Sequence, residues 1–167
     1  MQDIWTAYAN LPQDLPKGLC HLDMFTDNTL WEFGEDNGKA TAKLTGLLDF
    51  TEVSVEHYVM DIAITINDFC TTWGNATAGE SVNFDDAKMQ AFLVGYESVR
   101  ALTDDERQAL PVMLSFSATI FWLLRLNVIF YNREQGRSGA DIMVKNPDLM
   151  KRLASLHWGN VAACANY

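Results

Sequence analysis

The sequence has few basic residues, with 12 Lys and Arg against 22 Asp and Glu and a formal net charge of −10 at pH 7. The basic residues are scattered along the chain, so it lacks the positive patch that neutralises a nucleic-acid backbone. Nucleic-acid binding is therefore disfavoured. An acidic chain can still bind a nucleotide, because Mg²⁺ can bridge its carboxylates to the phosphates.

Cysteine is scarce as well, and Cys20, Cys70 and Cys164 lie far apart in the sequence. They form no C-x-x-C pair and have no nearby histidine at the spacing of a zinc site. The first residues lack the cationic start and the apolar run of a secretory signal peptide. We therefore expect a reduced, cytoplasmic protein without a disulfide framework.

A single segment, residues 112–130, is apolar enough to resemble a membrane span. Arg125 and Asn127 interrupt it, and three hydroxyl side chains dilute its apolar character. We expect this segment to form a buried helix of the core and do not expect contact with a membrane.

The length of 167 residues, 49% of them hydrophobic, suits a single domain over residues 1–167. Residues 1–15 have the apolar spacing of the end of a linker helix. Residues 16–52 contain short apolar runs separated by turn residues, and the last two runs predict a hairpin. Residues 53–167 have helical periodicity throughout.

Four helices are predicted within residues 53–167 from their apolar stripes and their start signals. They are expected to begin at Glu56, at Asn83, at the capping box Thr103-Asp-Asp-Glu106 and at Pro147. We expect Pro111 to kink or divide the third helix, since proline removes one helical hydrogen bond. The fourth helix is expected to end near Gly159.

Residues 21–28, which read His-Leu-Asp-Met-Phe-Thr-Asp-Asn, fit the pattern H-x-D-x-x-x-x-N, and Asp49 follows an apolar strand further along. Phosphoryl transfer needs a carboxylate that orients the attacking hydroxyl and accepts its proton, and it needs oxygen ligands for Mg²⁺. Asp23 suits the first task, and Asn28 and Asp49 suit the second. The alternative is that Asp23 only caps a turn.

These residues carry a resemblance to a known group of enzymes. Residues 21–28 resemble the catalytic loop shared by protein kinases, choline kinases and aminoglycoside phosphotransferases. Asp49-Phe50 resembles their metal-binding motif, without the protein-kinase glycine because Thr51 follows, and Asp61-Ile-Ala63 is similar to their Asp-Leu-Ala helix segment.

The resemblance implies an α+β, mainly α-helical fold, namely a protein-kinase-like C-terminal lobe with a small β-hairpin region. It implies that Asp23 is catalytic and that Asn28 and Asp49 are the magnesium ligands. It further implies that His21 and Asp61 are structural supports of the catalytic loop.

The wider sequence is similar to bacterial homoserine kinases at residues 15–28, 61–68, 121–126 and 145–157. This similarity implies phosphoryl transfer from ATP, with Mg²⁺, to the hydroxyl of L-homoserine in threonine biosynthesis. It covers only the carboxyl-terminal portion of that family, and we find neither the glycine-rich loop nor the phosphate-binding lysine of the preceding, ATP-gripping lobe. We therefore expect that this N-terminal lobe is absent and that the chain alone has little activity.

Homoserine carries an ammonium and a carboxylate, so its pocket should offer one acidic and one basic side chain. Asp68 shares a helical edge with Asp61 and is a candidate for the ammonium. Arg125 lies in the most apolar segment and needs an anion, which is either the substrate carboxylate or an internal carboxylate such as that of Asp68. Asp27 is either a further acidic contact or a solvated turn residue. Residues 132–142 are expected to form a mobile loop, and a substrate lid is an alternative.

Two other functions remain open at this point. The first keeps the fold and changes the acceptor to another small amino alcohol or an aminoglycoside, which a phosphorylation screen would detect. The second is a non-catalytic binding or assembly module that retains the kinase scaffold. Such a module would not bind a nucleotide in a Mg²⁺-dependent way.

Overall fold

The computed structural model describes residues 2–73, 82–136 and 145–164. The α-helices are α1 (Gln2–Ala9), α2 (Tyr58–Phe69), α3 (Asp86–Glu97), α4 (Asp104–Glu134) and α5 (Pro147–Cys164), and Thr26–Asn28 forms a 3₁₀ turn. The strands are β1 (Lys17–Cys20), β2 (Thr29–Asp36), β3 (Lys39–Leu47), β4 (Ser54–His57), β5 (Thr71–Trp73) and β6 (Val82–Phe84). They pair antiparallel as β1–β4, β2–β3 and β5–β6. The expected α+β, mainly α-helical class is confirmed.

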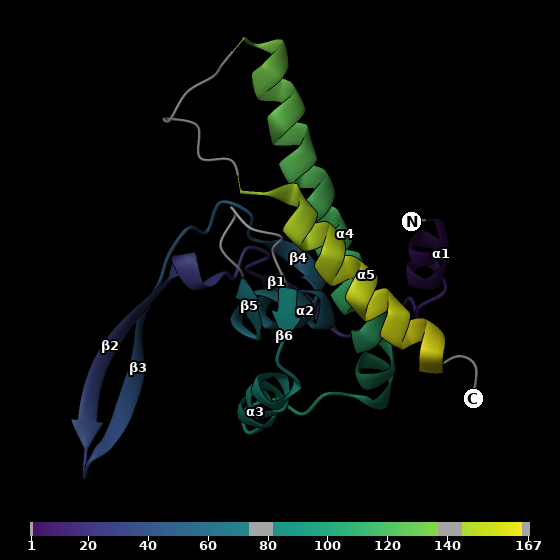
Figure 1. Ribbon diagram of the computed structural model, residues 1–167. Helices are drawn as coiled ribbons and strands as arrows, with labels where there is room; N and C mark the ends of the chain where they lie inside the picture. The colour runs from purple at the N-terminus through teal and green to yellow at the C-terminus, as the bar shows by residue number, and fades with distance from the viewer. Residues whose placement is uncertain (1, 74–81, 137–144, 165–167) are drawn as a thin grey trace.

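The body of the molecule is built around α4. Figure 1 shows α5 running alongside α4, and α2 also packs against α4. The apolar stripe of α2, which includes Val59, Ile62 and Ile66, is buried against Met113 and Leu114 of α4. Burial of such side chains contributes about 1.5–3 kcal/mol each, so this interface is a main source of stability.

A buried polar cluster fixes α2, α4 and α5 relative to one another. The side-chain amide of Asn67 donates to the carbonyl of Leu114 at 2.9 Å and to the hydroxyl of Ser117 at 2.9 Å. Its oxygen therefore faces Nε2 of His157, 2.9 Å away, and accepts a hydrogen bond from it. Burial lowers the pKa of His157 to about 4, so the imidazole is neutral and donates from Nε2.

Three short strands, β4, β5 and β6, were missed by the sequence analysis. Ser54–His57 forms β4 and pairs with β1, and the helix expected from Glu56 begins only at Tyr58. Val82–Phe84 forms β6, so the expected helix start at Asn83 is wrong. Helix α3 begins three residues later, after Asp85, whose side chain accepts a hydrogen bond from the backbone N–H of Lys88.

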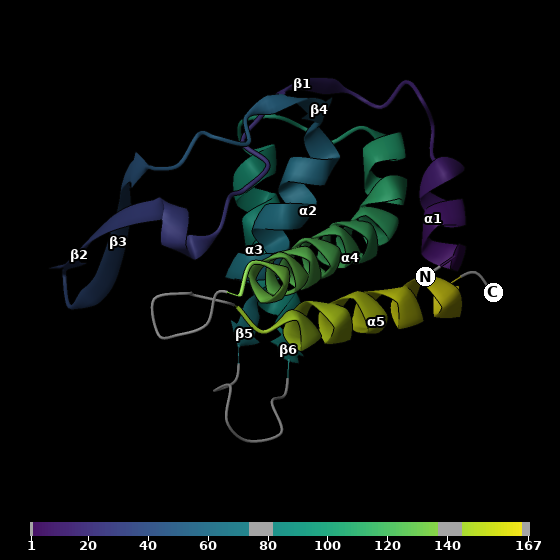
Figure 2. The same ribbon diagram turned by 90° about the horizontal axis from the view of Figure 1, so that it is seen from above.

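Helix α4 matches the expectation of a kink (Figure 2), whereas α5 does not end where expected. Helix α4 is continuous across Pro111, so the proline does not divide it, although Figure 2 shows its first turns running in a different direction from the rest. Helix α5 passes through Gly159 and ends at Cys164. A single helical glycine costs only about 1 kcal/mol relative to alanine, which the rest of the helix offsets.

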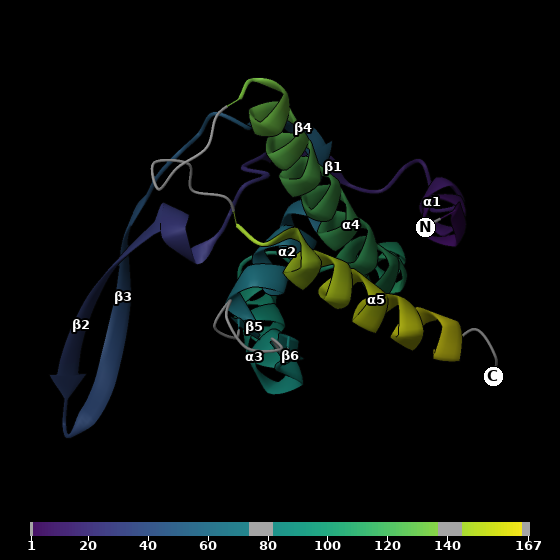
Figure 3. The same cartoon turned by 45° about the horizontal axis from the view of Figure 1, so that its top comes forward.

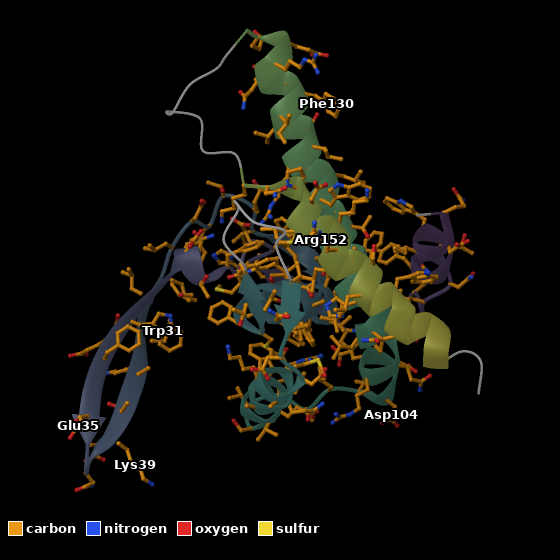
Figure 4. The ribbon with its side chains drawn as sticks, viewed as in Figure 1. Trp31, Glu35, Lys39, Asp104, Phe130 and Arg152 are labelled. Atoms are coloured by element: carbon orange, nitrogen blue, oxygen red, sulfur yellow. The ribbon has the colours of Figure 1, made fainter. Side chains whose placement is uncertain are left out.

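Helix α4 is buried along only part of its length. Residues 113–119 lie in the core, whereas beyond them Leu124 and Phe130 are 50% and 56% exposed. Figures 3 and 4 show this end of α4, which carries Phe130, extending past α5. The expectation of a buried helix over residues 112–130 is therefore right for the first half alone. Among the described residues, α4 is the one helix long and apolar enough to cross a membrane, a test that core helices also pass.

The β2–β3 hairpin projects from the body on the side opposite α1 (Figure 1). Its tight turn uses Asn37 and Gly38 at φ values of 50° and 76°, as a two-residue hairpin turn requires. Asn28 immediately precedes β2, and Asp49 follows β3. The backbone N–H of Leu48 donates to the carbonyl of Asn28 at 2.9 Å. The base of the hairpin therefore brings Asn28 close to the segment that carries Asp49.

Candidate active site

The loop that follows β1 is held by the carboxylate of Asp61 on α2. Its two oxygens accept hydrogen bonds from the backbone N–H groups of His21 at 3.1 Å and Leu22 at 2.8 Å. Leu22 has a φ of 62°, a left-handed conformation that costs a residue with a side chain about 1–2 kcal/mol. The carboxylate thus stabilises a strained turn that presents the next residue, Asp23.

The imidazole of His21 joins the two halves of the site. Its Nδ1 accepts from the backbone N–H of Asp23 at 3.3 Å, and its Nε2 lies 2.9 Å from the carbonyl of Leu48. A carbonyl only accepts, so the proton resides on Nε2 and the ring is neutral. Buried against Phe50, with ring centroids 5.0 Å apart, the ring ties the loop to the segment that carries Asp49.

The side chain of Asn28 holds the carboxylate of Asp23. Its amide nitrogen donates to the Asp23 carbonyl at 2.7 Å and to the Asp23 Oδ2 at 3.0 Å. The amide oxygen of Asn28 accepts no hydrogen bond from the residues that the structure describes. Burial raises the pKa of Asp23, the hydrogen bond from Asn28 opposes that rise, and the negative charge of Asp49 adds to it.

Asp49 lies at the solvent side of the same site, at a φ of 56°. The hydroxyl of Thr51 donates to its Oδ1 at 2.7 Å. This hydrogen bond, reinforced by the backbone N–H of Thr51, lowers the pKa of the Asp49 carboxyl. The carboxylate therefore stays ionised over the whole physiological range.

A pocket of about 480 Å³ brings most of the sequence-predicted residues together. Its lining includes four of them: Asp23, Asn28, Asp49 and Arg125. The other lining residues are Phe25, Asp27, Phe121 and Lys145. The lining thus includes three carboxylates (Asp23, Asp27 and Asp49) and two basic side chains (Arg125 and Lys145), an arrangement suited to a ligand that carries both charges.

The oxygen atoms around this pocket fit a magnesium ion. No group of three or more His, Cys, Asp or Glu side chains suited to a metal ion occurs in the parts of the chain that the structure describes. Mg²⁺ does not require one, since it binds through one or two carboxylates and completes its shell with waters and phosphate oxygens. The carboxylate of Asp49 and the amide oxygen of Asn28, which line the pocket together with Asp23, are ligands of that kind.

Asp68 is placed away from the pocket. It is buried, and it accepts hydrogen bonds from the backbone N–H of Thr26 at 2.7 Å, the Thr26 hydroxyl at 2.8 Å and the indole of Trp73 at 3.1 Å. These bonds occupy both of its oxygens. Its carboxylate holds the 3₁₀ turn that carries Asp27 and Asn28, and it does not line the pocket.

Arg125 faces the pocket from α4. Its guanidinium donates to the carbonyl of Asn146 at 3.1 Å. Burial lowers its pKa, and the charge of Asp68 opposes that shift. No carboxylate of the described residues lies within 4 Å, so the direct ion pair with Asp68 that the sequence left open is not formed. A partly buried guanidinium without an anion is a natural partner for one.

Lys145 was not predicted as a site residue. It lies just before α5, and its ammonium is 2.7 Å from Oδ2 of Asp27 and 5.3 Å from the centre of the Phe25 ring. Asp27 and Lys145 are 118 positions apart, so no local pattern reveals the contact. Of the loop expected at residues 132–142, residues 132–134 instead belong to α4, and residues 137–142 lie outside the described residues.

Comparison with known proteins places this site in a family context. Residues 1–102 match the family model described as "Phosphotransferase enzyme family". The homoserine kinase of Gluconacetobacter diazotrophicus is 38% identical over 141 residues, which are 84% of this chain and 38% of that protein. The homoserine kinase of Beijerinckia indica is 40% identical over 118 residues, or 71% of this chain and 32% of that protein. The chain thus spans about a third of the length of the curated relatives that it matches.

Proposed function

Because this chain belongs to the phosphotransferase enzyme family, we propose that it supplies the catalytic loop of an ATP-dependent kinase acting on a small-molecule hydroxyl. The observation that supports this most is that Asp23, Asn28, Asp49 and Arg125 line one pocket. The relatives named homoserine kinase make L-homoserine the proposed acceptor, and with it a cytoplasmic role in threonine biosynthesis.

Asp23 is the proposed catalytic base. Asn28 holds its Oδ2, which leaves Oδ1 to accept a hydrogen bond from the acceptor hydroxyl. A carboxylate placed in this way orients the oxygen for attack and takes up its proton as the bond to phosphorus forms. The raised pKa of Asp23 makes it a stronger base than an exposed aspartate.

Asn28 and Asp49 are the proposed magnesium ligands. When bound, the ion neutralises the phosphate oxygens of ATP and stabilises the charge that develops during transfer. The low pKa of Asp49 keeps a full negative charge available for it. His21 and Asp61 act on this site indirectly, because they fix the backbone on either side of it.

The chain by itself is proposed to have little turnover. It spans about a third of the length of its relatives, and a kinase also needs groups that grip the β- and γ-phosphates of ATP. We identified no glycine-rich loop with a paired lysine in the sequence. The proposed partner of this chain is therefore a segment that grips the phosphates of ATP.

The test replaces the matching segment of the Gluconacetobacter homoserine kinase with this chain and measures ATP-dependent phosphorylation. Homoserine, other amino alcohols and an aminoglycoside are compared as acceptors, with the isolated chain assayed beside the chimera. We expect Mg²⁺-dependent turnover that is highest for homoserine in the chimera and very low in the isolated chain. A folded chimera that binds no nucleotide in the presence of Mg²⁺ would refute the kinase assignment. A preference for another acceptor would refute only the homoserine assignment.

A further inference from the structure

The contact between Lys145 and Asp27 has the form of a bound ligand. A primary ammonium lies against a carboxylate oxygen at 2.7 Å and over an aromatic ring at 5.3 Å. Carboxylate and aromatic face are the two groups that bind organic ammonium ions in proteins. Lys145 also lines the pocket that is lined by Arg125 and by Asp23, the proposed catalytic base.

We propose that Asp27 and the face of Phe25 form the subsite for the ammonium of an α-amino acid substrate, and that Lys145 fills this subsite until the substrate displaces it. The inference rests on the proposed function and makes the acceptor class more specific. It also assigns the binding of the ammonium to Asp27 instead of Asp68, which the sequence had indicated.

The two aspartates differ in how far their oxygens are available. Asp68 is buried and already accepts three hydrogen bonds from Thr26 and Trp73. Asp27 is 69% exposed at its side chain, and its one described partner is Lys145. An incoming ammonium can therefore reach Asp27 without opening a buried network, whereas binding to Asp68 would require the 3₁₀ turn to move.

The Phe25 ring of the subsite is held rigidly, whereas the contact made by Lys145 is easily broken. Phe25 is buried and packs edge-to-face on Phe121 at 4.9 Å, so the ring is a fixed platform. The Lys145 side chain is 47% exposed, and exposed ion pairs are weak because water and salt screen them. A substrate that makes further contacts in the pocket can replace it.

The remaining contacts match the rest of an amino acid with a hydroxyl side chain. Arg125, with no carboxylate of the described residues within 4 Å, lines the same pocket and can bind the substrate carboxylate. Asp23 lies four positions before Asp27 on the same loop and receives the hydroxyl. Three groups of the substrate would thus be fixed at once, which is the condition for an efficient in-line transfer.

The experiment compares homoserine with 4-hydroxybutyrate, which has the same hydroxyl and carboxylate but no ammonium. Dissociation constants are measured by calorimetry on the chain, and KM values on the chimera described above. For Asp27→Asn we expect homoserine binding to weaken roughly tenfold, while 4-hydroxybutyrate binding stays unchanged. Glu35→Gln removes a carboxylate at the tip of the hairpin (Figure 4) and is expected to change neither ligand.

Lys145→Met tests the displacement. Removal of the competing ammonium is expected to strengthen homoserine binding by up to about fivefold and to leave 4-hydroxybutyrate unaffected. Equal effects of Asp27→Asn on both ligands, weaker homoserine binding in Lys145→Met, or no homoserine binding by the chain would each overturn the subsite. Homoserine binding that depends on Asp27 in a chimera without any phosphorylation would instead contradict the proposed kinase activity and leave the subsite standing.

Discussion

Replacement of Asp61 by asparagine should destabilise the loop that carries Asp23. The carboxylate accepts two backbone hydrogen bonds, and hydrogen bonds to charged groups contribute about 1.5–3 kcal/mol each. An asparagine keeps one acceptor and turns an N–H₂ group toward the other backbone N–H. The expected loss is therefore one charged hydrogen bond, about 1.5–3 kcal/mol, plus an unpaired donor, about 1–3 kcal/mol, or about 2.5–6 kcal/mol in the free energy of unfolding.

The measurement is urea unfolding of the chain, with Asp14→Asn as a control at an exposed aspartate. In the chimera the same variant should lower kcat at least tenfold, since the backbone that positions Asp23 is no longer fixed. An Asp61→Asn variant within 0.5 kcal/mol of the parent, with kcat reduced less than twofold, would refute the supporting role of this carboxylate.

Two further predictions concern the helices beneath the site. Glu106 is fully buried, and its carboxylate accepts hydrogen bonds from Arg100 at 2.7 Å and from the backbone N–H of Thr103 at 2.9 Å. Glu106→Ala should therefore lower the free energy of unfolding, measured in urea, by about 3–5 kcal/mol. A loss below 1 kcal/mol would contradict this prediction. The pKa of His157 is about 4 in the folded chain and near 6.5 in the unfolded chain. Between these pH values the unfolded chain therefore binds more protons than the folded chain. The free energy of unfolding should fall by up to about 3 kcal/mol as the pH drops through this range. His157→Gln should flatten that slope in urea titrations at pH 7, 5.5 and 4.5, and an unchanged slope would assign it to other groups.

The features of the fold and of the site that depend on nearby residues could be predicted from the sequence. The capping box at Thr103 forms as expected, because it depends on residues three apart. The hairpin before Asp49 was likewise visible from its apolar runs and turn residues. Strand β4 was missed because its four residues pair with β1 far away in the sequence, and the helical stripe that begins beside it masked the strand.

The contacts between distant segments were beyond the sequence. Asp68 appears on the same helical edge as Asp61, and both carboxylates do face the loop, but helical spacing alone does not show that Thr26 and Trp73 occupy Asp68. Lys145 reaches Asp27 only because α4 and α5 return the chain to the pocket. Such contacts follow from helix packing, which local patterns leave undetermined.

The most direct measurement is the kinetics of Asp23→Asn in the chimera, with Asp14→Asn as the control. Loss of the base should lower kcat for homoserine phosphorylation by about 10²–10⁴-fold. The KM for homoserine should change little, because Asp27 and Arg125 remain. Retention of kcat within tenfold of the parent enzyme would contradict the assignment of Asp23 as the catalytic residue.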